Sequence, residues 1–309
     1  MTQTTIDYRQ ILKDIYDEIH PLSKEGYVAN YIPELAKVDP DKFGMTLNPL
    51  DGDIYSIGDV DQKFSIQSIS KVLSLTLALT IRGEGIWKRL GVEPSGDPFN
   101  SFVQLEYENG IPRNPFINAG ALVIADILYT ELRDPLNDYL TFIRKISDID
   151  TICYNEEVAS SEFETGSRNM ALAHFLKSYG NLHNDITKVL EFYCHICAIE
   201  MSCTELSRTF HLFAKHGLSL PLERQTISQS RIKRVNAIMQ TCGFYDESGQ
   251  FAFKVGLPGK SGVGGGIVAI YPLKYSVAVW SPRLNNKGNS IMGMKALELL
   301  TSKSAMSIF

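Results

Sequence analysis

The sequence predicts an α+β fold with one antiparallel sheet flanked by the first and last helices, and with an all-helical lobe beside it. Three observations carry this prediction. Strand patterns occur near residues 45–57 and return after Gly243, helical periodicity fills the middle, and a helical pattern stands at each end. The sheet lobe should therefore combine 1–65 with 244–309, around a helical lobe of 66–243. Because no repeat or low-complexity linker separates them, we expect one domain over 1–309.

The first elements are a helix and a hairpin. Apolar residues recur at helical spacing from residue 8 to 19 and stop before Pro21, which predicts an amphipathic helix. Strand character at 45–47 and 54–57 surrounds Asp51-Gly52, a dipeptide typical of hairpin turns.

The next segments should bury two helices. The helix that begins near Ser68 is apolar on nearly every face and should end near Gly83. Glycine, proline and asparagine are frequent in 94–115, which predicts a long irregular connection. Asn118 precedes the apolar stretch 119–129, where it could cap a buried helix or bind a ligand.

The rest of the chain is first helical and then strand-like. Helices are predicted over these ranges: 136–147, 165–179, 185–200, 202–216 and 227–241. After Gly243, alternating and β-branched residues predict strands at 251–255, 262–270 and 275–280, followed by a last helix over 289–302.

Composition excludes several classes of function. The 309 residues carry a net charge of −5 and no basic run, which argues against nucleic-acid binding. We see no signal peptide, and the apolar runs are too short to cross a membrane. The cysteine count is odd, so reduced thiols and a cytoplasmic location are expected.

Cys194 and Cys197 have the spacing of half a zinc site, because they stand in Cys-His-Ile-Cys. The other half is missing, and the pair lies in an apolar helical stretch. A core role is therefore favoured over a metal or redox role, and we expect no metal and no cofactor.

The stretch 64–73 reads FSIQSISKVL and places Ser68 three residues before Lys71. On a helix these two side chains share one face. A lysine kept neutral by burial can remove the serine proton, and the free N–H groups of a helix start favour an oxyanion. The segment thus predicts a nucleophile, a base and half of an oxyanion hole.

The chain also contains a second S-x-x-K, formed by Ser230 and Lys233. This copy lies among Arg224, Arg231 and Arg234, which indicates a solvated helix start. The apolar residues that follow Lys71 give that lysine a reason to lose its charge, and Lys233 has no comparable reason.

A glycine-rich stretch, 256–266, contains Lys260-Ser261-Gly262. It resembles the end of a P-loop, but Lys254 stands where that pattern needs glycine, and a strand is expected to follow instead of a helix. The glycines more plausibly let a substrate or another backbone approach closely.

Together, S-x-x-K and Lys260-Ser261-Gly262 form the combination used by serine β-lactamases and penicillin-binding proteins. Ser167-Arg168-Asn169 stands as a possible counterpart of their S-D-N motif. Lys260 would add positive potential near Lys71, and the Val263 N–H could complete the oxyanion hole with that of Ser68.

Longer blocks resemble the serine-dependent glutaminase family, from about residue 25 to about residue 300. The blocks are YIPELA at 31–36, FSIQSISKV at 64–72, NPFINAGA at 114–121 and PGKSGVGGG at 258–266. The resemblance implies a β-lactamase/transpeptidase-like fold and hydrolysis of L-glutamine to L-glutamate and ammonia without cofactor. It also implies a homo-oligomer, either a homodimer or a homotetramer.

Position by position, the resemblance implies that Ser68 is the nucleophile, Lys71 the general base and Tyr245 a helper in proton transfer to ammonia. The implied substrate contacts are Tyr31, Ser68, Asn118, Glu162, Asn169, Tyr193, Tyr245 and Val263. Lys260, Ser261 and Gly262 would support them. Ser167 departs from the acidic residue expected before Arg168-Asn169, which leaves the role of its side chain open.

The residue types fit this assignment. An amino-acid substrate needs an acidic partner for its ammonium group, which Glu162 supplies, and donors for its carboxylate, which asparagine and tyrosine side chains supply. Read without the family, Glu162 could be a charge near a helix start, and Tyr193 and Tyr245 could be core tyrosines.

Two other functions remain open at this stage. A β-lactam hydrolase or peptidase on the same fold would be acylated by penicillins. A non-enzymatic protein would bind glutamine or glutamate without releasing ammonia, but it would gain nothing from a buried lysine beside a serine.

Overall fold

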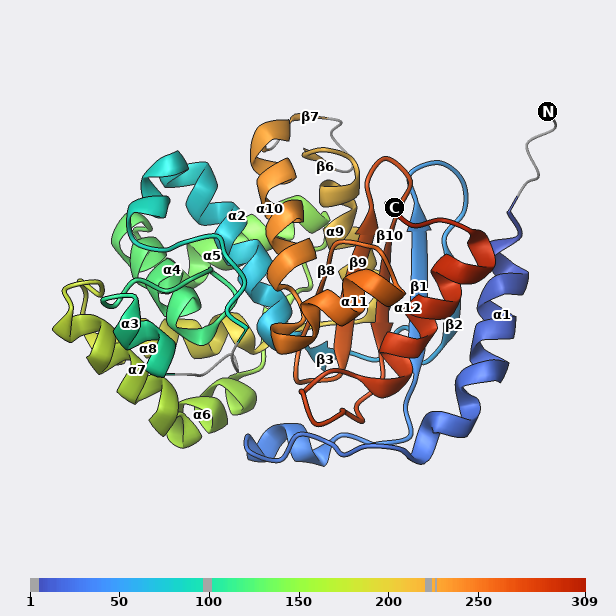
Figure 1. The fold of residues 1–309 in the computed structure, drawn as a ribbon, viewed down its shortest axis with the longest axis horizontal. Helices are drawn as coiled ribbons and strands as arrows, with labels where there is room; N and C mark the ends of the chain where they lie inside the picture. The colour runs from blue at the N-terminus through green and yellow to red at the C-terminus, as the bar shows by residue number, and fades with distance from the viewer. Residues whose placement is uncertain (1–5, 97–101, 220–223, 226) are drawn as a thin grey trace.

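A five-stranded antiparallel sheet forms the centre of one side of the molecule (Figure 1). The computed structural model describes residues 6–96, 102–219, 224–225 and 227–309. The strand order is β2-β1-β10-β9-β8. The strands are β1 (Gly44–Pro49), β2 (Tyr55–Gly58), β8 (Gly259–Ser261), β9 (Gly266–Tyr271) and β10 (Tyr275–Trp280). Both ends of the chain therefore build the sheet, as predicted.

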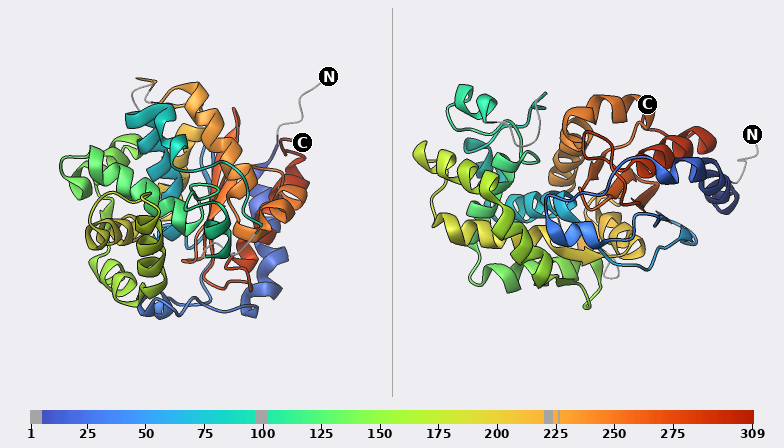
Figure 2. Two further views of the ribbon diagram at one scale, coloured as in Figure 1. Left: turned by 60° about the vertical axis from the view of Figure 1, so that its left-hand side comes forward. Right: turned by 90° about the horizontal axis from the view of Figure 1, so that it is seen from below.

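Both faces of this sheet are covered. Ile267 and Ala269 pack into the cluster under α1 (Tyr8–Ile19) and α12 (Ile291–Ser304), which lie side by side in both views of Figure 2. The alternate β9 residues, Val268 and Ile270, belong to the larger core on the opposite face. Since side chains alternate along a strand, an apolar run such as Ile267–Ile270 indicates a sheet buried on both faces.

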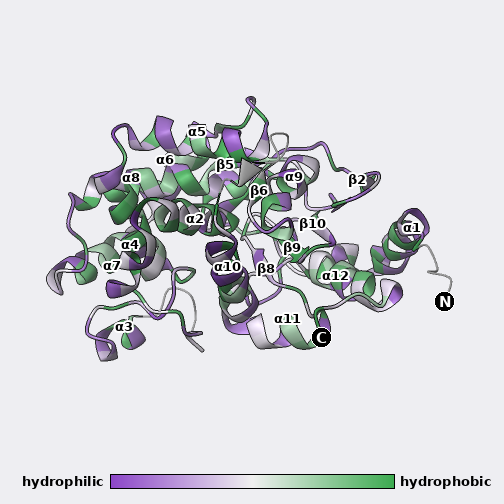
Figure 3. Cartoon of the chain, turned by 90° about the horizontal axis from the view of Figure 1, so that it is seen from above, coloured by the Kyte–Doolittle hydropathy of each residue, from purple (hydrophilic) through white to green (hydrophobic). Residues whose placement is uncertain are grey.

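The helical lobe packs around α2 (Ser70–Arg82), whose neighbours include α4 (Asn118–Glu131), α8 (Ile186–Cys197) and α10 (Gln229–Cys242). Figure 3 shows apolar residues where helices face one another and polar residues on their outer sides. The other α-helices of the lobe are α3 (Val103–Tyr107), α5 (Pro135–Ser147), α6 (Glu156–Thr165), α7 (Ser167–Ser178) and α9 (Cys203–Ala214). Short 3₁₀ helices are η1 (His20–Lys24), η2 (Pro33–Lys37), η3 (Gln67–Ile69), η4 (Gly83–Lys88) and η5 (Tyr245–Glu247).

The middle of the chain is not all-helical, contrary to the prediction. Strands β3 (Phe64–Ser65), β5 (Ile199–Met201) and β4 (Cys153–Tyr154) form a small antiparallel sheet in the order β3-β5-β4. A second pair joins β6 (Leu218–Ser219) to β7 (Arg224–Gln225). Strands of two or three residues are too short to produce a visible alternating pattern, which explains why the sequence did not predict them.

Three helices also differ from the prediction. The expected strand at 251–255 is the helix α11 (Ser248–Lys254), in which Phe251 is buried and stacks on Phe244 while Phe253 is 89% exposed. The expected helix 165–179 corresponds to α7 (Ser167–Ser178), and a helix that was not predicted, α6 (Glu156–Thr165), ends just before it on the other side of Gly166. Finally, α9 packs on the face of the sheet rather than only within the helical lobe.

Two further observations concern the predicted connection and membrane spans. Part of the irregular connection 94–115 falls at 97–101, outside the described residues, and α3 (Val103–Tyr107) forms in its middle. Among the described helices, none has the length and hydropathy needed to cross a membrane.

Candidate active site

Ser68 and Lys71 lie together at the buried start of α2. Ser68 belongs to η3, which leads directly into the helix, and Lys71 is in the first turn of α2. Their exposed fractions are only 9% and 3%. The residue before the serine, Gln67, has φ +48°, a left-handed conformation that costs a non-glycine residue free energy and is often found at functional sites.

The amine of Lys71 has two hydrogen bonds. Its Nζ donates to Asn118 Oδ1 over 2.7 Å and to the Phe116 carbonyl over 3.2 Å, and among the described residues none of its hydrogen bonds reaches Ser68 Oγ. Burial lowers the pKa of Lys71 to about 8, although Cys197 and Glu162 act in the opposite direction. A neutral amine has two N–H bonds and one lone pair, so these two acceptors leave the lone pair available for a proton.

Glu162 of α6 is the buried carboxylate of the site. Gln67 Nε2 donates to Glu162 Oε2 over 3.3 Å and to Ser65 Oγ over 3.0 Å. Burial raises the pKa of Glu162 to about 7, while hydrogen bonding from Gln67 and the charge of Lys71 lower it. Gln67 was not predicted as a site residue, although its place directly before Ser68 is a usable signal.

Asn118 does not cap α4, so the capping interpretation is wrong. The helix begins at Asn118 itself, and no side chain caps it. Asn114 explains this start, because its Oδ1 accepts from Phe116 N and Ile117 N and shapes the preceding turn. The Asn118 amide is therefore free to accept from Lys71 and to donate from Nδ2 to Asn169 Oδ1 over 2.9 Å.

The turn between β8 and β9 packs directly against Ser68. A Cβ on Gly262 would lie 2.5 Å from Ile66 O and 3.4 Å from Ser68 N, so this close approach requires glycine. The strand β9 follows the turn, as predicted, and not the helix of a P-loop. In the described turn, Gly262 N and Gly265 N bind backbone carbonyls, and no hydrogen bond takes the Val263 N–H.

Lys260 is completely buried behind this turn. Its Nζ donates to Ser261 O over 2.6 Å and lies 4.4 Å from the centre of the Tyr245 ring. Burial and the nearby charge of Lys71 hold the pKa of Lys260 well below its ordinary value. Lys71 and Lys260 therefore lie close enough to interact electrostatically, and the positive potential that Lys260 was expected to add near Lys71 stays a prediction.

Tyr245 approaches Ser68 from the side of β8. It lies in η5 with φ +56°, a left-handed conformation. Burial raises the pKa of Tyr245 to about 12, and hydrogen bonding with Ser68 and Ser261 opposes this rise. The phenol therefore remains protonated at neutral pH next to the Ser68 hydroxyl.

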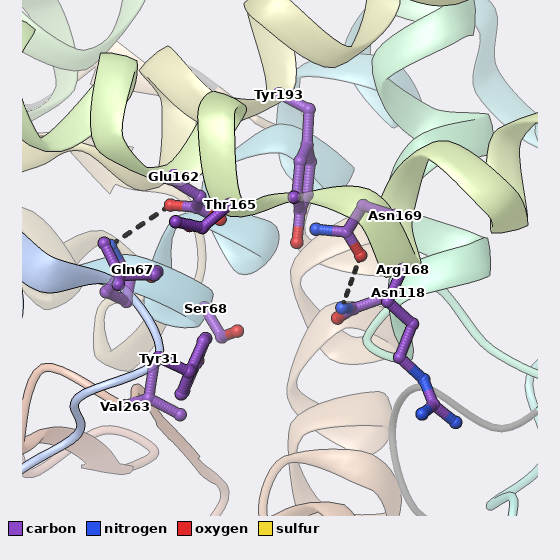
Figure 4. A pocket seen from close by; sticks show the side chains of 12 residues that line it. Tyr31, Gln67, Ser68, Asn118, Glu162, Thr165, Arg168, Asn169, Tyr193 and Val263 are labelled. Atoms are coloured by element: carbon purple, nitrogen blue, oxygen red, sulfur yellow. Dashed lines mark hydrogen bonds between the residues drawn. The ribbon is translucent and has the colours of Figure 1, made fainter.

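A cavity of about 340 Å³ opens above Ser68. Figure 4 shows Ser68, Tyr193, Asn118 and Asn169 with their polar groups turned toward this space. All the predicted substrate contacts line it except Tyr245: Tyr31, Ser68, Asn118, Glu162, Asn169, Tyr193 and Val263. The lining also includes residues that the sequence analysis did not assign to it: Ile32, Gln67, Thr165, Gly166 and Arg168. Ser167 is exposed and is not part of the lining.

Cys194 and Cys197 are buried in α8, as their apolar surroundings indicated. The Cys197 thiol lies within hydrogen-bonding reach of Tyr193 and Ser70, beneath the cavity. In the part of the chain that the structure describes, no three His, Cys, Asp or Glu side chains form a group that could hold a metal ion.

Comparisons with known proteins agree on one family. The family model described as Glutaminase matches residues 26–309. A protein named Glutaminase from Christiangramia forsetii is 56% identical over 304 residues, covering 98% of this chain and 100% of the relative. Another from Saccharophagus degradans is 55% identical over 304 residues, covering 98% of this chain and 99% of the relative.

Solved structures give the same result. The structure titled Probable glutaminase ybaS has a TM-score of 0.92 and 33% sequence identity, and the match covers 97% of each chain. The Bacillus subtilis probable glutaminase has a TM-score of 0.89 and 33% identity, with 98% of each chain covered.

Proposed function

The chain belongs to the glutaminase family and hydrolyses L-glutamine to L-glutamate and ammonia, and we propose that it does so through a Ser68 acyl-enzyme with Lys71 as general base. The single observation that carries this mechanism is the state of Lys71. Its pKa is lowered to about 8 by burial, and its two hydrogen-bond acceptors leave a lone pair one helical turn from the serine.

In the first step, Ser68 Oγ attacks the side-chain amide carbon of glutamine, and Lys71 takes the hydroxyl proton. The backbone N–H groups of Ser68 and Val263 stabilise the oxyanion. The C–N bond then breaks, and the proton that left Ser68 reaches the departing nitrogen with the help of Tyr245, so that ammonia forms. Water attacks the γ-glutamyl ester in the second step and regenerates the Ser68 hydroxyl.

The polar lining of the cavity suits the two charged groups of the amino acid. Glu162 would bind the substrate ammonium, which favours the ionised carboxylate. Asn118, Asn169, Tyr31 and Tyr193 offer amide and hydroxyl donors for the carboxylate. No step of this mechanism uses a metal or an organic cofactor.

Ammonia release by the purified protein tests the proposal. L-Glutamine should be turned over in the presence of phosphate, and Ser68→Ala should reduce turnover to background. L-Asparagine, one methylene shorter, should react more slowly, because one methylene contributes about 1–3 kcal/mol to discrimination. Full activity in Ser68→Ala would rule out the serine as nucleophile.

We also propose that the chain forms a homodimer or homotetramer and works in the cytoplasm. The family resemblance supports the assembly, and large exposed apolar side chains such as Tyr107 and Phe253 are compatible with an interface. All five cysteines are unpaired, which suits a reducing compartment. Light scattering of the purified protein would check the assembly.

A further inference from the structure

Tyr245 needs external support to keep its conformation. A left-handed backbone with φ +56° costs a tyrosine free energy, and it persists only when neighbouring contacts impose it. The two residues that follow, Asp246 and Glu247, both bind the same distant segment, 285–289, which comes after β10.

Glu247 carries most of this connection. Asn285 Nδ2 donates to both of its carboxylate oxygens, over 3.2 and 2.9 Å, and Asn289 Nδ2 donates to Oε2. Lys287 forms an additional ion pair with Asp246. Because the Lys287 side chain is half-exposed, solvent weakens its ion pair, and the hydrogen bonds to the Glu247 carboxylate should dominate the attachment.

The segment 285–289 is itself a rigid turn. Asn285 Oδ1 accepts from Lys287 N over 2.9 Å and from Asn289 N over 3.1 Å, and Asn285 N donates to Asn289 O over 2.8 Å. Asn289 is completely buried. A turn held by these hydrogen bonds can keep neighbouring side chains in a fixed position.

This turn comes close to the active site at Gly288. A Cβ at this glycine would lie 3.9 Å from Tyr245 Cε2 and 3.6 Å from Val263 Cγ1. The turn thus borders the tyrosine ring and the residue proposed to complete the oxyanion hole. From these interactions we propose that Glu247 is a positioning residue, which holds the 285–289 turn beside the Tyr245 ring and keeps the phenol at Ser68.

This inference rests on the proposed role of Tyr245, and it predicts an effect that depends on the leaving group. An amide nitrogen must gain a proton as its bond breaks, whereas the alkoxide of an ester leaves far more readily without one. Displacing the phenol should therefore slow acylation by L-glutamine more than acylation by L-glutamate γ-methyl ester.

The experiment compares kcat/KM for these two substrates in Glu247→Ala. We expect the value for L-glutamine to fall about 10- to 100-fold, the scale of a small misplacement of a catalytic group, and the value for the ester to fall less than about threefold. Glu247→Gln keeps an acceptor for both asparagines and should restore most of the L-glutamine activity. Glu131→Ala is the matched control, because this glutamate is partly exposed and pairs with Arg82 away from the site.

The outcomes distinguish the positioning role of Glu247 from the proton-transfer role of Tyr245. An equal loss on both substrates in Glu247→Ala would mean a smaller folded fraction and would overturn the positioning role. Tyr245→Phe, measured in parallel, should show the same amide-selective loss. If Tyr245→Phe shows it and Glu247→Ala does not, only the role of Glu247 fails. If Tyr245→Phe affects both substrates equally, its proposed role in proton transfer fails as well.

Discussion

The chain contains the same motif twice, in two regions that the fold treats very differently. Ser68 and Lys71 begin α2, which is surrounded by α4, α8 and α10, and both side chains are buried. Ser230 and Lys233 lie at the start of α10, where both are exposed. Spacing is identical in the two copies, so spacing alone does not create a reactive lysine.

Partners distinguish the two copies as clearly as burial does. Lys71 donates to an asparagine side chain and a backbone carbonyl drawn from the 116–118 segment. These acceptors orient the amine without providing a carboxylate that would hold its proton. Lys233 is exposed to water and lacks the burial that acts on Lys71. The chemistry of S-x-x-K therefore comes from the site that surrounds it.

The largest expected effect comes from replacing Lys71. Lys71→Met should lower kcat for L-glutamine by about 10³-fold or more, since general-base assistance alone contributes about 10²–10⁴-fold. Lys71→Arg should be equally inactive, because a guanidinium keeps its charge and offers no lone pair. Steady-state ammonia release measures both variants, and circular dichroism checks that they fold. Substantial activity in either would remove Lys71 as the base.

The second effect is on pH dependence. The reaction needs neutral Lys71, with a pKa lowered to about 8, and ionised Glu162, with a pKa raised to about 7. Lowering the pH protonates both groups, so kcat/KM should fall roughly a hundredfold or more from pH 8 to pH 6. A profile of kcat/KM that stays flat over this interval would contradict the assignment of both groups.

Much of the difference between the two S-x-x-K copies could be predicted from the sequence, because it depends on the residues that flank each copy. The apolar residues after Lys71 indicated a buried helix, and the alternation at 275–280 located β10 at its observed bounds. The Lys260-Ser261-Gly262 block gave the second side of the site, which the structure places against Ser68.

The rest depends on contacts between distant segments. Asn118 could be interpreted as a cap because a single sequence does not show that Asn114 shapes the turn before the helix. It also does not show that Asn118 binds Lys71, which is 47 positions away in the sequence. The strain at Gln67 and Tyr245 is equally invisible, since tertiary packing imposes these backbone conformations against local preference. For the same reason, the sequence predicts a strand where α11 forms: Phe251 and Phe253 alternate in sequence, but only Phe251 packs in the core.

A smaller effect is expected at Glu162, because this residue is proposed to bind the substrate and not to take part in the reaction at Ser68. Glu162→Gln removes the charge proposed to hold the substrate ammonium and should raise KM for L-glutamine about 10- to 100-fold, in line with about 1.5–3 kcal/mol for a hydrogen bond to a charged group. Glu164→Gln is the matched control, because it removes an exposed carboxylate from the same helix. An unchanged KM in Glu162→Gln would place the ammonium elsewhere.

The smallest effect should come from the second copy of the motif. In the double variant Ser230→Ala with Lys233→Met, kcat/KM should stay within about twofold of the original, and the free energy of unfolding should change by no more than about 0.5 kcal/mol. Both side chains are exposed, and the ion pair between Arg234 of α10 and Glu84 of η4 is left intact. Ammonia release and urea denaturation measure the two quantities. A large loss of activity with normal stability would mean that the exposed copy takes part in the reaction, and the distinction drawn from burial and partners would no longer hold.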